Sequence, residues 1–238
     1  MEETKLNSEL GVFNKPMGRL SFLKYTGATA AATGLMMVGC KDILDEVIVP
    51  PGQSMAVKLG SGDIGVLNYA YALEQLEAAF YIQIVKTPYR GITDEEKQIM
   101  SDLKAHEVIH RDFLKAALGS KAIKGLTVNF SSINFSSRDS VLNTAKAFED
   151  LGVSAYNGAG KLIVDANYLL LAGKIVSVEA RHAAAIRDLL NPKSADFAGD
   201  DVVSVDKGLD GAKTPAEVLK IAGKYIKDKI DASQLPTS

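Results

Sequence analysis

Two short stretches hold all three histidines of the chain, and each contains the pattern Glu-x-x-His. One stretch pairs Glu107 with His110 and is preceded by His106, and the other pairs Glu179 with His182. On a helix, a spacing of three residues places a carboxylate and an imidazole one turn apart on the same face. Both groups are common ligands of transition metals, so the two stretches predict a metal site.

Two more glutamates, Glu74 and Glu149, each precede a tyrosine by seven residues, namely Tyr81 and Tyr156. Seven residues are two helical turns, so each glutamate shares a face with its tyrosine. A buried tyrosine hydroxyl needs a hydrogen-bond partner, and a metal-ligating carboxylate can supply one. The sequence therefore contains the same pattern twice, a glutamate, a tyrosine seven residues later and then a Glu-x-x-His motif, which indicates a repeated pair of helices. Glu77, one turn after Glu74, is predicted to be an extra ligand or an acceptor behind the ligands.

Apolar residues at helical spacing predict four helices. The first runs from about Asp63, a candidate N-cap, to Lys86, and the second from a Thr93 and Glu96 capping box to about Gly119. After a long connection over residues 120–136, the third begins near Ser137 and the fourth ends before Asn191-Pro192. The turn between them lies within residues 158–165, and we favour its later part.

Helix lengths test whether the candidate ligands can meet. A rise of 1.5 Å per residue places the glutamates of each helix pair about 20 Å from the turn that joins them. The long connection reaches about 55 Å when extended, more than the roughly 33 Å it must cross. The sequence thus predicts an all-α bundle of two antiparallel pairs joined by one long crossover, with six groups in one layer: Glu74, Glu107, His110, Glu149, Glu179 and His182.

Four buried carboxylates need compensating positive charge, because an unpaired buried charge is very costly. Two divalent ions carry +4, which balances four ionised glutamates. Oxygen-rich ligands with two imidazoles suit iron or manganese better than a structural zinc site, which usually contains thiolates. We therefore predict two iron or two manganese ions.

At this point the residues resemble a known family. Leu73-Glu74-Gln75-Leu76-Glu77-Ala78-Ala79-Phe80-Tyr81 and Val178-Glu179-Ala180-Arg181-His182-Ala183 are similar to the ferritin-like domain family, which includes desiccation-related proteins and exported bacterial relatives. The resemblance covers about Asp63 to Leu190 and implies a ferritin-like bundle with a di-iron or di-manganese centre. It implies that Glu107 and Glu179 bridge the ions, that His110 and His182 are terminal ligands, and that Glu74 and Glu149 are terminal or bridging ligands.

The first of the two histidine-containing stretches also admits another interpretation, because His106-Glu107-x-x-His110 matches the motif of zinc metalloproteases. In that case both histidines bind zinc and Glu107 is the general base. This alternative explains neither the second Glu-x-x-His nor the matched depths of the glutamates. In the bundle, His106 is instead expected behind the ligands or at the edge.

The segments on either side of the predicted bundle are interpreted as an export signal, a linker and a C-terminal extension. Residues 1–40 read as an export signal with a lipid attached to Cys40, because a short apolar run ends in Val38-Gly39-Cys40. Arg19 to Lys24 also resembles a twin-arginine signal, but Leu20 replaces its second arginine, so the export route stays open. Residues 41–61 are predicted to be a linker, 62–191 the bundle, and 192–238 an extension whose one short helix, from about Thr214 to Ile226, packs outside the bundle.

Composition bounds the function. The chain has 238 residues, 47% of them hydrophobic, and a net charge of −2, so we expect one domain with a core and no nucleic-acid partner. We expect an envelope oxidoreductase that acts on O2 or H2O2 in stress protection, resembling a ferroxidase, peroxidase or catalase. The alternative is a non-catalytic stress-protection or binding module stabilised by metal. The expected location is the cell envelope, in the periplasm or outer membrane, and the oligomeric state is left open, a homo-oligomer included.

Overall fold

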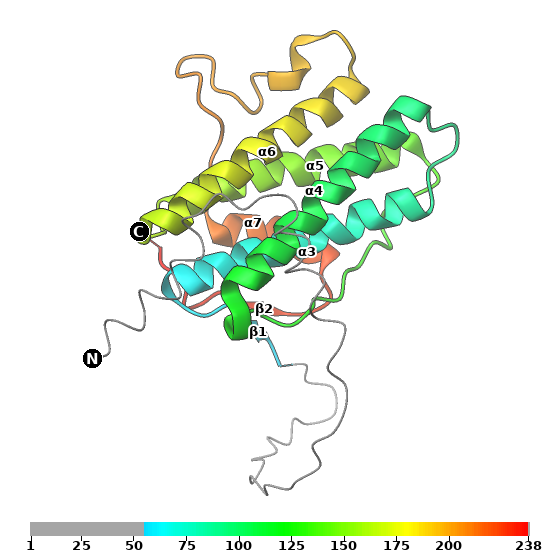
Figure 1. Ribbon diagram of the computed structural model, residues 1–238. Helices are drawn as coiled ribbons and strands as arrows, with labels where there is room; N and C mark the ends of the chain where they lie inside the picture. Colours follow the sequence, from blue (N-terminus) through cyan, green and yellow to red (C-terminus); the bar gives the residue numbers. More distant parts are fainter. Residues whose placement is uncertain (1–54, 238) are drawn as a thin grey trace, which may run out of the picture. The chain divides into compact units, whose positions relative to one another are not determined.

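The computed structural model describes residues 55–237, which contain four long helices arranged as a bundle (Figure 1). These helices are α3 (Gly62–Lys86), α4 (Asp94–Leu118), α5 (Arg138–Gly160) and α6 (Ala166–Leu190). α3 packs along α4 and α5 packs along α6, and a short turn within each pair makes its helices antiparallel. Residues 119–137 form the long connection between the pairs. The predicted all-α bundle with one crossover is therefore confirmed.

Side-chain caps fix where the helices begin. The Thr93 hydroxyl accepts a hydrogen bond from the Glu96 N–H, and the Glu96 carboxylate accepts one from the Thr93 N–H. This is the capping box that the sequence predicts. α5 begins as expected after Ser137, which accepts a hydrogen bond from the Ser140 N–H. α3 begins at Gly62, one residue from its expected start, and ends at Lys86 as expected, but the prediction that Asp63 caps this helix was wrong.

Asp63 instead connects the start of α3 to the turn between α5 and α6. Its two carboxylate oxygens accept hydrogen bonds from the backbone N–H groups of Val164 and Asp165, both at 2.8 Å. That turn spans residues 161–165, so its later predicted position is confirmed. Gly158, which argued for an earlier turn, lies inside α5. A side chain there would collide with the backbone of Lys213, so this glycine allows close approach of the C-terminal extension.

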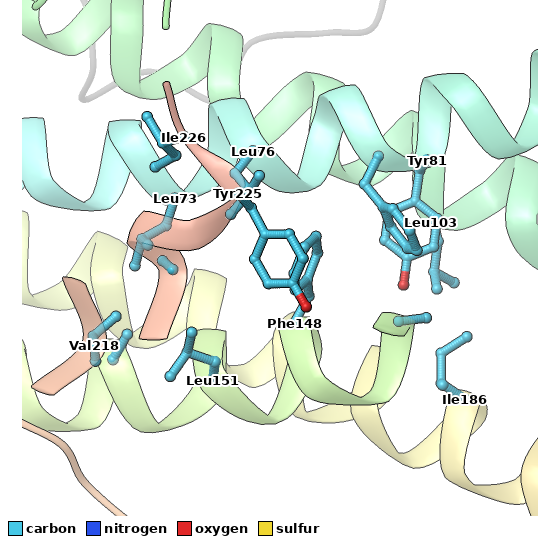
Figure 2. Packing of buried hydrophobic residues seen from close by; sticks show 14 of the residues in the cluster. Leu73, Leu76, Tyr81, Leu103, Phe148, Leu151, Ile186, Val218, Tyr225 and Ile226 are labelled. Carbon is cyan, nitrogen blue, oxygen red and sulfur yellow. The ribbon is translucent and has the colours of Figure 1, made fainter. Parts of the chain in front are cut away.

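Aromatic side chains of α3, α5 and the C-terminal extension join the two helix pairs. The ring centroid of Phe80 on α3 lies 5.0 Å from that of Phe148 on α5, and Phe148 lies 4.7 Å from Tyr225. Figure 2 shows Phe148 and Tyr225 stacked edge to face among the buried aliphatic side chains. Edge-to-face pairs of this kind stabilise a core beyond the area they bury.

The C-terminal extension contributes to the core, and the expectation that its helix packs outside as an appendage was wrong. It contains the short 3-10 segments η2 (Ala195–Ala198) and η3 (Gly223–Tyr225) and the helix α7 (Pro215–Ala222). Val218 and Ala222 of α7 are fully buried in the same apolar cluster as the bundle residues. Figure 2 shows Val218 beside Leu151 of α5.

The N-terminal part of the predicted linker also packs into the domain where the structure describes it. β1 (Val57–Lys58) pairs in parallel with β2 (Ile230–Asp231), and Leu59 is fully buried. The packed domain therefore begins before Ser61, where the sequence had placed the end of the linker. Cys40 and the predicted signal lie outside the described residues. Within residues 55–237, no helix has the length and apolar character needed to cross a membrane.

Candidate metal centre

Six ionisable side chains from the four long helices meet in the middle of the bundle. The carboxyl groups of Glu74, Glu107, Glu149 and Glu179 are fully buried, His182 is 3% exposed and His110 is 9% exposed. Glu74 lies on α3 and Glu149 on α5, whereas one Glu-x-x-His motif lies on α4 and the other on α6. The structure therefore brings together all six groups that the sequence placed in one layer.

The six side chains form two overlapping groups of four, each able to hold a metal ion. The Glu74 group contains Glu74, Glu107, His110 and Glu179, and the Glu149 group contains Glu107, Glu149, Glu179 and His182. One ligand atom per residue can be chosen so that all four lie within 4.8 Å of one another. Glu107 and Glu179 belong to both groups and therefore lie between the two candidate positions.

The two groups are related by an approximate two-fold symmetry. His110 Nδ1 lies 2.8 Å from Glu179 Oε1 and 3.6 Å from Glu74 Oε2. In the other group, His182 Nδ1 lies 2.8 Å from Glu107 Oε1 and 3.5 Å from Glu149 Oε2. Near-equal distances in the two halves agree with the repeated helix pair in the sequence.

The hydrogen-bond pattern fits a metal centre. Although the imidazole nitrogens lie close to the carboxylate oxygens, eight buried oxygen and nitrogen atoms of the centre make no hydrogen bond within the described residues. These atoms are one oxygen each of Glu74 and Glu149, both oxygens of Glu107 and Glu179, and Nδ1 of His110 and His182. Buried polar groups in native proteins are nearly always satisfied, so this set needs another partner. It provides four atoms for each group, as two bound cations require.

Two tyrosines donate hydrogen bonds to the remaining oxygens of Glu74 and Glu149, the two glutamates that each belong to only one group. The Tyr81 hydroxyl on α3 donates to Glu149 Oε1 on α5, and the Tyr156 hydroxyl on α5 donates to Glu74 Oε1 on α3, both at 2.5 Å. Each tyrosine thus serves the glutamate of the opposite pair rather than the one on its own helix. Hydrogen bonds of this kind orient metal ligands and leave one oxygen of each carboxylate free for an ion.

In the metal-free cluster, burial and the neighbouring charged groups shift the pKa values of the candidate ligands. Burial, followed by the negative charges of neighbouring glutamates, raises the pKa of Glu74 well above its usual range and that of Glu149 to about 8. Burial lowers the pKa of His110 and His182, but the glutamate carboxylates close to both imidazoles outweigh it and raise both to about 12. Protons and metal ions compete for the same atoms in such a cluster.

Glu77 is a fifth carboxylate at the edge of the centre. It is 4% exposed, and burial together with the charges of Glu107 and Glu179 raises its pKa well above its usual range, which favours the protonated form. Its equivalent in the repeat is Gly152, three residues after Glu149 as Glu77 is three after Glu74. A Cβ on Gly152 would lie 3.0 Å from Glu77 Oε1 and 3.7 Å from Glu179 Oε2. The glycine therefore makes room for the extra carboxyl.

Sequence reasoning did not single out Gly152. The signal was present, because the repeat that pairs Glu74 with Glu149 and Tyr81 with Tyr156 also pairs Glu77 with Gly152. When a repeat has a large side chain at one position and glycine at the equivalent position, the large side chain can fill the space that the glycine leaves, as Glu77 does beside Gly152.

His106 lies at the bundle edge and contacts the Glu149 group from outside. It is exposed, its Nδ1 lies 2.9 Å from His182 Nε2, and the two rings stack with centroids 5.1 Å apart. Burial and the nearby imidazoles of His182 and His110 lower the pKa of His106. Neither group of candidate ligands within residues 55–237 includes His106, so the zinc protease interpretation lacks its pair of histidine ligands.

Comparison with known proteins agrees with this architecture. The family model of the ferritin-like domain matches residues 62–192, which is more than half of the chain. The chain therefore belongs to the ferritin-like domain family. A search of curated proteins found no match. The buried cluster of carboxylates and histidines in this fold indicates a metal site.

Proposed function

We propose that the chain binds two iron or two manganese ions and acts as an oxidoreductase on O2 or H2O2 in stress protection. The observation that carries this proposal is the set of eight buried, unsatisfied ligand atoms arranged as two groups of four. Oxygen-rich sets with one imidazole per ion suit iron or manganese. When bound, such ions would supply two electrons, which together with two protons reduce H2O2 to two water molecules or O2 to H2O2.

The side chains of this chain would hold the ions, orient the ligands and limit access of water. Glu107 and Glu179 lie between the two positions, and the tyrosine hydroxyls fix the orientation of Glu74 and Glu149. Burial and the charges of Glu107 and Glu179 raise the pKa of Glu77, so its carboxyl is suited to supply a proton beside the centre, where the reduction of peroxide or oxygen consumes protons. Burial of all four ligating carboxylates excludes bulk water, which strengthens each electrostatic interaction in the site.

Anaerobic loading tests this proposal. The protein is incubated with Fe(II) or Mn(II) without oxygen, desalted and analysed for metal, and the loaded protein is then mixed with O2 or H2O2 in a stopped-flow spectrometer. We expect two ions per chain and oxidation within seconds. The control is Glu149→Gln, which replaces a charged carboxylate of a single group with a neutral amide. Binding of no metal by the unmodified protein would contradict the proposal.

The deep burial of the centre also favours a second candidate, a module in which metal only stabilises the bundle. All four ligating carboxylates are fully enclosed, as in a structural site. This function predicts metal-dependent stability without turnover. A ligand present at 100 times its dissociation constant stabilises a fold by about 2.7 kcal/mol, so loading would raise the melting temperature even if peroxide and O2 did not react.

An envelope location through a lipid on Cys40 is a further part of the proposal. It is supported by the short apolar run that ends in Gly39-Cys40. Mass spectrometry of the protein from membranes tests it, with the expected mature chain beginning at an acylated Cys40. A chain that retains Met1 and an unmodified Cys40 thiol would overturn it, and Cys40→Ser provides the matched control for membrane association.

A further inference from the structure

The bundle core is not filled equally on the two sides of the centre. A cavity of about 20 Å³ lies among the four long helices, between the centre and the turn that joins α5 to α6. Its wall includes residues from every long helix, among them Leu67, Ala70, Leu114, Ala159, Ala172 and Ile175. A volume of this size is just above the roughly 10–15 Å³ that a single water molecule needs.

The cavity adjoins the Glu74 group. Ala70 precedes Glu74 by four residues and Leu114 follows His110 by four, so each is one helical turn from a ligand of that group. Tyr156, whose hydroxyl donates to Glu74 at 2.5 Å, also lines the cavity. One layer of side chains therefore separates the cavity from the Glu74 group.

The equivalent space beside the Glu149 group is filled. Leu103, Ala145 and Ile186 each lie four residues from a ligand on that side, and they are 5%, 0% and 0% exposed within the main apolar cluster. Figure 2 shows Leu103 and Ile186 close to Tyr81, the tyrosine that serves Glu149. Since the ligands themselves are nearly symmetric, the difference lies in the packing around them.

The chemistry of the wall limits what can occupy the cavity. Its lining is almost entirely apolar, so water and hydrogen peroxide would lose hydrogen bonds on entering it. Apolar cavities of proteins stay dry and bind small apolar molecules. The volume excludes an acyl chain or an aromatic compound. A diatomic gas satisfies both conditions, and among the substrates of the proposed function only O2 is such a molecule.

We propose that this cavity is a binding site for O2 that leads only to the Glu74 group. The outer wall lies between α4 and α6, where Phe113 and Ala117 are exposed and Tyr168 and Leu171 are half-buried. α4 and α6 make few contacts with each other, so side chains rather than closely packed helices form the wall on this side. The identity of the gas rests on the proposed function, whereas the existence of an apolar site does not.

Xenon, an apolar atom that needs no metal, tests the site directly. Methyl NMR spectra of the full chain are recorded under xenon pressure, and we expect shifts for Leu67, Leu114 and Ile175. The variant Ala172→Leu fills the cavity, and we expect it to weaken xenon binding by at least about tenfold, since one or more methylene groups added to a pocket have effects of this size. The control is Ala185→Leu, another half-buried alanine of α6 that does not line the cavity.

The second measurement distinguishes O2 from peroxide. In metal-loaded protein, Ala172→Leu is expected to slow oxidation by O2 by about tenfold and to leave oxidation by H2O2 unchanged, whereas Ala185→Leu changes neither. Absence of xenon shifts, or equal shifts in Ala172→Leu, would overturn the site. Equal slowing of both oxidants would overturn its assignment to O2. Failure to bind metal would remove the proposed function without affecting the xenon result.

Discussion

The two halves of the centre have nearly the same ligands and different surroundings. Each half has one outer glutamate, one histidine and the two shared glutamates, with nearly the same distances. Beside the Glu74 group lies an apolar cavity, whereas beside the Glu149 group the core is filled and His106 supports His182 from outside. A repeated helix pair thus provides a symmetric ligand set, and the non-repeated residues make the two positions inequivalent.

The largest effect is expected for the side chains that the two halves share. Glu179→Gln removes a charged ligand from both groups, so we expect it to abolish binding of both ions. Glu149→Gln changes only one group, and one ion per chain should remain. Metal analysis after anaerobic loading measures both. If Glu179→Gln retained two ions while Glu149→Gln lost both, the division into two overlapping groups would be wrong.

A smaller effect is expected for His106, which contacts only one half. His106→Phe keeps a ring next to His182 and removes the hydrogen bond to Nε2. Loss of such a supporting contact typically weakens metal affinity by 10–100-fold, so we expect about this loss for one ion and none for the other. Calorimetric titration with Mn(II) measures the two affinities. Val178→Ala, at the equivalent position before Glu179, is the control, and equal weakening of both ions would contradict the inequivalence.

Packing around the two halves is compared by one substitution made at two positions of α5. Ala145 is fully buried on the filled side, and Ala159 lines the cavity. Overpacking a filled core costs about 1–3 kcal/mol, so we expect Ala145→Leu to lower the free energy of unfolding by this amount. Ala159→Leu should cost less than Ala145→Leu, because part of the added volume enters the cavity. Urea denaturation of the metal-free protein measures both, and equal costs would show that the cavity is not a real difference.

A pH dependence of the free energy of unfolding is also expected, from groups in both halves. The pKa of Glu149 is about 8 in the folded chain against 4.5 in the unfolded one, so the folded state binds more protons between these values. The pKa of His110 and His182, raised from 6.5 to about 12, acts in the same direction above pH 6.5. Glu107, whose pKa is lowered to about 2, contributes stability that is lost only in acid.

The free energy of unfolding of the metal-free protein should therefore fall as pH rises from about 5 to 8. Thermal melts at fixed ionic strength measure this change. In metal-loaded protein the ions replace the protons and bind more tightly as pH rises, so the decline should disappear or reverse. A metal-free protein that becomes more stable over this range would show that the cluster does not hold protons as described.

Residue types and spacings were sufficient to predict most of the bundle and to place the six groups together. Helical periodicity, the Thr93 capping box and the rise per residue are local properties, so they set the helices and the depth of each ligand without tertiary information. The predictions failed where a distant segment decided the outcome. Asp63 binds the α5–α6 turn rather than capping α3, and α7 enters the core rather than lying outside it.

By itself, the sequence determined which side chains could form a charged centre, because a repeated motif at helical spacing must present its groups on one face of each helix. Only the tertiary structure decided what surrounds each half of that centre. The cavity and the contact between His106 and His182 depend on how side chains from separate helices fill a shared volume, and no local pattern specifies that filling.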